Sequence, residues 1–140
     1  VEPDISAAVW PGRLQRIGTS PEILLDGAHN PAGARSLAEH PRAFYNGRRV
    51  RLIYGAMRDK SVQEIVDLLF PLAEDVIVTA PSSPRAVRPE VLLSMTDHPN
   101  ARVIRSVPDA LQEARWSARE DVVVITGSLY LIGEVLALLQ

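Results

Sequence analysis

The sequence contains no cysteine, carries little net charge and has few histidines. Without cysteine the chain has no disulfides, no cysteine-based zinc site and no thiol nucleophile. Fifteen basic and seventeen acidic residues give a net charge of −2, which does not indicate binding to nucleic acid or to an acidic membrane surface. The three histidines, His29, His40 and His98, are too scattered along the sequence to indicate a metal site.

The sequence also lacks a leader and an uninterrupted membrane segment. No basic-then-apolar stretch opens the chain, so no signal peptide is expected. Residues 121–140 are apolar, but Asp121, the break at 126–128 and Glu134 divide them into a strand and a helix. A cytoplasmic protein without membrane contact is therefore expected. The chain begins with Val1, so we expect it to be a piece of a longer protein.

Strand-like and helix-like segments alternate through the 140 residues, a length that suits one ordinary domain with a hydrophobic core. This alternation predicts right-handed crossovers in an α/β domain, with a mostly parallel sheet of about six strands and helices on both faces. The predicted strands are 13–18, 22–26, 50–54, 75–79, 101–105 and 121–125, the first two forming an antiparallel hairpin through the turn at 19–21. The predicted helices begin near Pro31 and after Ser61, and span 89–95, 108–119 and 128–139.

Two of the predicted helices have recognisable starting residues. Asn30 precedes Pro31, and proline is favoured at the first helical position, so Asn30 is the expected N-cap. Ser61 is followed three residues later by Glu64, which is the spacing of a capping box. Both helices are therefore expected to start at a side chain that accepts a backbone hydrogen bond.

The most function-bearing segment follows the predicted strand 22–26. Asp26, His29 and Asn30 come directly after apolar residues and directly before a predicted helix. In an open α/β sheet, ligands bind at the carboxyl ends of the strands. An acid, an imidazole and an amide are therefore expected to share one crevice, where Gly27 allows a ligand to approach the backbone closely.

Each of these polar residues has a structural and a functional interpretation. Asp26 is either a cap for the following helix or an acceptor for ribose hydroxyls or an ammonium group. His29 lies outside the apolar pattern, so it is either an ordinary surface histidine or a proton carrier beside an anionic ligand. Arg13 follows Trp10-Pro11-Gly12. It is either an exposed strand arginine or a guanidinium that stacks on a base or binds phosphate.

A second candidate lies where the predicted strand 121–125 passes into the last helix. The free N–H groups at that helix start and the Ser128 hydroxyl form a seat for a carboxylate or a phosphate. Ser128 is equally suited to be the helix N-cap, so both roles stay open.

Two loops at the same predicted sheet edge carry charged residues. Residues 55–61 resemble a phosphate loop, but Asp59 stands where the motif GxxxxGK[ST] requires its second glycine. We therefore expect no P-loop in this chain. The loop 81–86 is either a stiff connection or the support for a rim arginine, Arg85, that contacts a ligand or another domain.

Five segments are together similar to the C-terminal domain of the folylpolyglutamate synthase/dihydrofolate synthase family, within the Mur ligase superfamily. In order they read WPGRLQ, LLDGAHNPAGA, GAMRDKS, PSSPRA and ITGSLYLIGE. The hexapeptide 26–31 is the most specific of them, because the related cell-wall ligases and cyanophycin synthetase tend to carry tyrosine at the position of Gly27. The resemblance assigns 10–140 to a Mur-ligase-type C-terminal domain and leaves 1–9 as the remnant of a linker.

The resemblance implies a Rossmann-like three-layer domain of an ATP-dependent amide ligase. Such a ligase converts a carboxylate of folate or dihydropteroate into an acyl phosphate, which the amine of L-glutamate then attacks. At matching positions, Arg13 and Asp26 would contact ATP, Arg13 near base or phosphate and Asp26 at the ribose. His29 would be catalytic and face the acyl phosphate and the incoming glutamate. Ser128 is a weaker candidate for the glutamate side.

The resemblance also implies that essential parts of the enzyme lie outside this chain. In the family, an N-terminal domain holds the P-loop, Mg²⁺ and most of the folate site. The isolated chain is therefore expected to be inactive as a ligase, since phosphoryl transfer requires positioned cations and a phosphate cradle. Three alternatives remain open: a freestanding nucleotide-binding module with a regulatory or scaffolding role, a fragment of another Mur-type ligase, and a receiver-type signalling domain. The last ranks lowest, because Asp26 and Asp59 are too few and too differently placed for its acidic cluster.

Overall fold

The computed structural model describes residues 14–19, 21–44 and 47–139. Its strands are β1 (Gln15–Thr19), β2 (Glu22–Asp26), β3 (Val50–Tyr54), β4 (Asp75–Val78), β5 (Ala101–Val103) and β6 (Val122–Thr126). Its helices are α2 (Pro31–Ala38), α3 (Val62–Leu69), α4 (Pro89–Ser94), α5 (Val107–Arg115) and α6 (Leu129–Leu138), with a 3₁₀ turn η1 (Phe70–Leu72) after α3. The expected linker at 1–9 and the candidate residue Arg13 lie outside the described residues.

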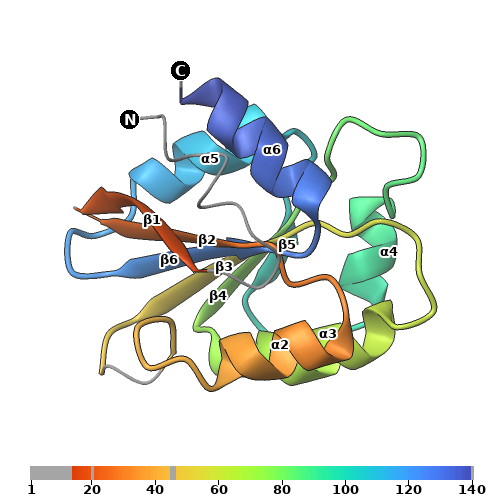
Figure 1. Ribbon diagram of the computed structural model, residues 1–140, viewed down its shortest axis with the longest axis horizontal. Helices are drawn as coiled ribbons and strands as arrows, with labels where there is room; N and C mark the ends of the chain where they lie inside the picture. The colour runs from red at the N-terminus through yellow and green to blue at the C-terminus, as the bar shows by residue number, and fades with distance from the viewer. Residues whose placement is uncertain (1–13, 20, 45–46, 140) are drawn as a thin grey trace.

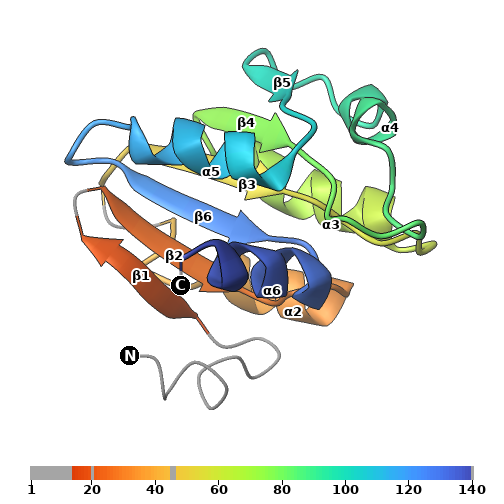
Figure 2. The same ribbon diagram turned by 90° about the horizontal axis from the view of Figure 1, so that it is seen from above.

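The strands form one six-stranded sheet in the order β1-β2-β6-β3-β4-β5 (Figures 1 and 2). β1 pairs antiparallel with β2, and every other neighbouring pair is parallel. The predicted mostly parallel sheet with an antiparallel first strand is confirmed. β6 lies between β2 and β3 and is parallel to both, so the carboxyl ends of these three strands lie side by side.

Helices cover both faces of the sheet, as predicted (Figure 1). α2 and α3 pack on one face, where Leu24 and Leu52 point into the core beneath them. α5 and α6 pack on the other face, where Leu25 and Ile53 point. Neighbouring residues of a strand point to opposite faces, and burial on both faces explains why the central strands are continuous apolar runs.

The capping box predicted for α3 is wrong. The Ser61 side chain makes no capping hydrogen bond, and its backbone N–H instead donates to Asp59 Oδ1 at 2.8 Å. Glu64 pairs with Arg35 of α2, with 3.2 Å between Arg35 Nη1 and Glu64 Oε2. Asp59, two residues before Ser61, thus accepts the N–H that a capping box would assign to Glu64, and Glu64 pairs with a cation on the neighbouring helix instead.

Other boundaries differ from the prediction by a few residues. α5 spans Val107–Arg115, whereas the sequence predicted a helix continuing to residue 119. β5 is three residues long and is only partly buried, because it lies at the sheet edge. An edge strand has one pairing partner, so its far end departs from the sheet sooner than the central strands do.

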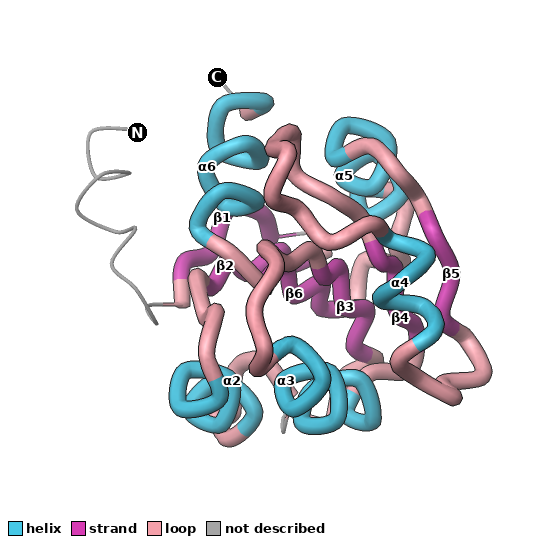
Figure 3. Tube along the Cα trace, turned by 90° about the vertical axis from the view of Figure 1, so that its right-hand side faces the viewer, coloured by secondary structure: helices cyan, strands magenta, loops and turns pink. Residues whose placement is uncertain are grey.

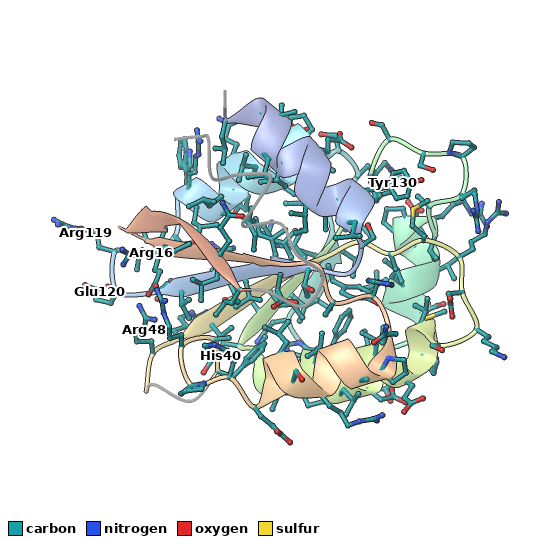
Figure 4. All side chains as sticks on the ribbon, viewed as in Figure 1. Arg16, His40, Arg48, Arg119, Glu120 and Tyr130 are labelled. Carbon is teal, nitrogen blue, oxygen red and sulfur yellow. The ribbon has the colours of Figure 1, made fainter. Side chains whose placement is uncertain are left out.

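The amino-terminal edge of the sheet is occupied by ion pairs. Glu22 contacts Arg42 Nη2 at 2.9 Å and Arg48 Nη1 at 2.7 Å. Burial alone would raise the pKa of Glu22, but the hydrogen bonds and charges of the two arginines outweigh it and lower the pKa. Figure 4 shows Arg48 and Arg119 at this end of the sheet and Tyr130 toward the other end. These ion pairs lie at the amino-terminal ends of the strands, opposite the carboxyl ends that carry the candidate site.

No described helix is long and apolar enough to cross a membrane. The apolar C-terminal stretch forms β6 and α6, as predicted. Its β6 side chains alternate between the two cores, and the buried side chains of α6 fill the core on the α5 face.

Candidate functional site

The carboxyl ends of β2, β3 and β6 meet at one edge of the sheet, which Figure 3 views face on. The residues after these strands surround a cavity of about 290 Å³, which we call the strand-edge cavity. Its lining comprises His29, Tyr54, Ala56, Met57, Arg58, Asp59, Val62, Ile65, Arg85, Gly127, Ser128, Leu129 and Tyr130. The structure therefore brings His29 and Ser128, which are 99 positions apart in the sequence, to the same cavity.

His29 is exposed and fixed in orientation by its own turn. Its Nδ1 lies 2.9 Å from the backbone oxygen of Gly27. A carbonyl oxygen only accepts hydrogen bonds, so Nδ1 donates and the neutral ring keeps its lone pair on Nε2. The ring is thus held at the cavity wall with Nε2 available to a ligand, as an acceptor when neutral and as a donor when protonated.

The two helix starts at this edge are capped from within the chain. The Asn30 side chain accepts a hydrogen bond from Gly33 N–H at 2.8 Å, which confirms its predicted capping role. The Ser128 hydroxyl accepts one from Leu131 N–H at 3.0 Å. Ser128 is buried and caps α6 while it lines the cavity, so its structural role is realised and its hydroxyl proton remains available to a neighbouring acceptor.

Asp26 lies at the carboxyl end of β2 but is not part of the cavity lining. Only 3% of the residue is exposed. Its Oδ1 accepts a hydrogen bond from Ala28 N–H at 2.9 Å, so Asp26 closes a local turn. The interpretation of Asp26 as the cap of α2 is therefore wrong. Burial raises the pKa of Asp26 and outweighs the hydrogen bond from Ala28, which lowers it.

We expect Asp26→Asn to raise the free energy of unfolding at neutral pH. The amide oxygen still accepts the Ala28 N–H, while the buried charge is removed. Because the folded-state pKa lies above the ordinary value of 3.8, the carboxyl's contribution to stability is complete below that pH and is lost as pH rises through the folded pKa. The gain in the asparagine variant should therefore be present at pH 7 and disappear near pH 3, as measured by urea unfolding across this range.

Asp26→Ala is the matched control, because it removes the acceptor as well as the charge. It should be less stable than Asp26→Asn by about 1 kcal/mol, the usual net value of one hydrogen bond. A loss of stability in the asparagine variant that does not change with pH would contradict the assignment of a buried, unfavourable charge.

Gly127 allows β3 and β6 to end close together. Its φ is +126°, and an added Cβ would lie 2.3 Å from the Gly55 backbone oxygen and 3.0 Å from Tyr54 Cε1. Gly55 N–H donates to Thr126 O at 3.2 Å, so the two strand ends cannot separate without losing pairing. Glycine at 127 is therefore required by both the backbone conformation and the close approach.

Charged residues from two further loops also line the strand-edge cavity. Arg58 and Asp59 follow β3, and Arg85 projects from the loop after β4. Glu134 of α6 holds that loop by accepting hydrogen bonds from Ser82 N–H at 2.8 Å and Ser82 Oγ at 3.2 Å. The expected rim arginine is thus part of the cavity lining, on a loop tied to the helix that Ser128 starts.

Tyr54 and Tyr130 are cavity residues that the sequence did not single out. Tyr54 ends an apolar strand, so its residue type and position predict an ordinary core residue. Tyr130 lies in the first turn of α6, where Ser128 was the predicted site residue. Tyr130 is 64% exposed, so it borders the cavity from the solvent side. The sequence signal was position: Tyr54 ends β3, and Tyr130 is the second residue of the helix that follows β6.

The strand-edge cavity suits a small ligand that carries both signs of charge. Arg58 and Arg85 provide cationic donors, Asp59 provides a carboxylate, and His29 provides a nitrogen that can accept or donate. Among the described residues, no group of three histidine, aspartate or glutamate side chains could hold a metal ion. The charged groups of the cavity therefore match a polar organic ligand that carries both signs of charge.

Residues 12–129 match the model of the Mur ligase, glutamate ligase domain family. The chain belongs to this family. The match covers most of the chain and includes every candidate residue of the strand-edge cavity except Tyr130.

Individual relatives of this glutamate ligase domain have consistent names. The chain is 38% identical to a probable bifunctional folylpolyglutamate synthase/dihydropteroate synthase of Haloferax volcanii, with 96% of the chain and 17% of that protein covered. It is 31% identical to a dihydrofolate synthase/folylpolyglutamate synthase of Bacillus subtilis, with 91% of the chain and 30% of that protein covered. The chain thus spans less than a third of the length of these relatives.

Solved structures agree with these relatives. The Escherichia coli FolC protein in complex with DHPP and ADP superposes with a TM-score of 0.83 at 29% identity, over 96% of this chain and 32% of that one. A bifunctional folylpolyglutamate synthase/dihydrofolate synthase with Mn, AMPPNP and L-glutamate bound superposes with a TM-score of 0.82 at 29% identity, over 95% of this chain and 32% of that one. The predicted resemblance to the C-terminal domain of folylpolyglutamate synthase/dihydrofolate synthase is confirmed, whereas the roles of individual site residues stay predictions.

Proposed function

We propose that this glutamate ligase domain forms the ATP- and glutamate-contacting part of an ATP-dependent ligase that adds L-glutamate to folate or dihydropteroate. The observation that carries the proposal is the strand-edge cavity, where His29, Ser128 and two arginines converge in a domain of this family. The crystallised relatives bind ADP, DHPP and L-glutamate as proteins about three times as long. A partner domain that supplies a phosphate-binding loop therefore belongs to the proposal.

The proposed reaction has two steps. The γ-phosphoryl group of ATP passes to a carboxylate oxygen of the pterin substrate, giving ADP and an acyl phosphate. The amine of L-glutamate then attacks the acyl carbon, an amide bond forms, the C–O bond to phosphate breaks, and inorganic phosphate leaves. Enclosure between two domains would exclude water, which otherwise hydrolyses the acyl phosphate.

His29 is the residue of this chain that we place at the reacting atoms. The amine of glutamate attacks only after losing a proton, and Nε2 of the neutral ring is free to accept one because Nδ1 is engaged with Gly27. Arg58 and Arg85 provide charge for the carboxylates of the amino acid. Ser128 is proposed to donate its hydroxyl proton to the same substrate.

Asp26 and Arg13 are proposed to contact ATP, Asp26 at the ribose and Arg13 at the base or a phosphate. Burial of the Asp26 carboxylate is unfavourable at neutral pH, because it raises the pKa of the group. Residues that bind a ligand often carry such a cost in stability. In Asp26→Asn the amide oxygen occupies the turn and leaves only an NH₂ donor toward a ribose hydroxyl, so KM for ATP should rise although the fold is no less stable. Arg13→Ala should raise the same KM.

The Mg²⁺ that accompanies ATP is proposed to be bound mainly by the partner domain, as the family resemblance implies. No step performed by this chain depends on it. The experiment that tests the proposed function is ADP release dependent on both a folate substrate and L-glutamate, compared between the isolated chain and the full-length protein.

A further inference from the structure

Tyr54 lines the strand-edge cavity and carries a buried hydroxyl that bonds to none of the described residues. The residue is fully buried at the carboxyl end of β3 and is part of the cavity lining. Within the part of the chain that the structure describes, its hydroxyl oxygen has no hydrogen-bond partner. A buried hydroxyl without a partner is unfavourable and uncommon in folded proteins, so the position needs an explanation.

The ring of Tyr54 is held in place on two sides. It packs edge-to-face on Phe70, with ring centroids 5.4 Å apart and planes at 79°. On another side, the ring lies against Gly127, where a Cβ would come within 3.0 Å of Tyr54 Cε1. The ring fits there because residue 127 has no side chain. Because these contacts fix the ring, the hydroxyl cannot swing toward a partner elsewhere in the core.

The surroundings make this hydroxyl a hydrogen-bond donor toward an anion. Burial, with a smaller effect from the charge of Asp59, raises the pKa of Tyr54 well above its ordinary value, so the phenol keeps its proton at neutral pH. Arg58 and Arg85 line the same cavity and attract a negatively charged group. A protonated phenol in a cavity that two arginines also line suits a carboxylate, which accepts hydrogen bonds and never donates them when ionised.

We propose that the Tyr54 hydroxyl donates a hydrogen bond to a carboxylate of the amino-acid substrate and so helps to select an acidic amino acid. This inference rests on the proposed function and adds a binding residue to it. The substrate carboxylate provides the hydrogen-bond partner that the described residues do not, so the buried hydroxyl is paired only in the complex. Specificity of this kind is strong, because a site built to pair a polar group disfavours any ligand that leaves it unpaired.

The test is Tyr54→Phe in the full-length protein, assayed for ADP release with L-glutamate as the varied substrate. We expect KM for L-glutamate to rise about ten- to a hundredfold, the usual effect of losing a hydrogen bond to a charged group, with kcat changed far less. The unfolding midpoint of the ligand-free protein should stay the same or rise, because the hydroxyl makes no hydrogen bond to any described residue.

Thr79→Val is the matched control, since it also deletes a fully buried hydroxyl at a strand end. The Thr79 hydroxyl has a partner within the chain, donating to Arg105 O at 3.1 Å, and Thr79 does not line the strand-edge cavity. This variant should lower the unfolding midpoint and leave KM for L-glutamate unchanged. The two variants thus separate a hydroxyl that binds substrate from one that stabilises the fold.

An unchanged KM for L-glutamate in Tyr54→Phe would overturn the inference while leaving the proposed function intact. A lowered unfolding midpoint without a change in KM would overturn it as well, by assigning the hydroxyl a structural role. If the unmodified full-length protein releases no ADP in response to folate and glutamate, the proposed function itself fails, and the inference fails with it.

Discussion

Replacing His29 with alanine in the full-length protein should lower kcat for glutamate addition about a hundredfold or more, the lower end of what a positioned acid–base group contributes. The physical reason is the turn at 27–29, which fixes Nδ1 on a backbone oxygen and leaves Nε2 at the cavity. KM for ATP should change little, because the ring is assigned to the amino-acid side of the reaction. Steady-state measurement of ADP release at saturating substrates checks both numbers.

His98→Ala provides the comparison for His29→Ala. His98 Nε2 lies 2.7 Å from Ala73 O, in a loop near the start of β4, at the edge of the sheet opposite the strand-edge cavity. Its loss should lower stability and leave kcat unchanged. Equal kcat values for the unmodified protein and His29→Ala would show that the imidazole has no part in the chemistry.

Replacing Gly127 with alanine should lower the free energy of unfolding by about 3 kcal/mol or more, since a strained backbone and a steric overlap add. The added methyl group would meet the Gly55 backbone oxygen at 2.3 Å, and backbone at a paired strand end cannot yield as a flexible side chain does. The positive φ of +126° adds strain in any residue with a Cβ. Urea unfolding of the purified chain measures the effect.

Gly133→Ala is the matched control for Gly127→Ala. Gly133 lies within α6, and an added Cβ would meet nothing within 4 Å. Alanine there should stabilise the chain by up to about 1 kcal/mol, because it favours the helix and restricts the unfolded state. A loss at Gly127 no greater than the change at Gly133 would mean that the strand ends are looser than the structure shows.

The fold was predictable because its signals are local and repeated. The run 122–125 is apolar at every position, as burial on both faces requires, and the polar segment 26–30 marks where β2 stops. Strand order was not predictable, since nothing local states that β6 inserts between β2 and β3. The capping box at Ser61 failed because Asp59 competes for the same backbone donor and Arg35 is within reach of Glu64.

The candidate site was predictable only in part. His29 and Ser128 were expected from residue type and position at strand ends, and the structure places them on one cavity. Tyr54 was missed because an aromatic residue in an apolar strand looks like core until the structure shows that its hydroxyl has no partner among the described residues. The burial of Asp26 was missed because it depends on how the turn at 26–28 packs, which the sequence does not state.

We propose that this domain offers one side of a ligase site that a neighbouring domain completes. The most direct measurement is ADP release in the presence of ATP, a folate substrate and L-glutamate, made in parallel on the isolated 140-residue chain and on the full-length protein. We expect release that depends on both substrates in the full-length protein and none above background in the isolated chain. Substrate-dependent release from the isolated chain, or none from the full-length protein, would contradict it.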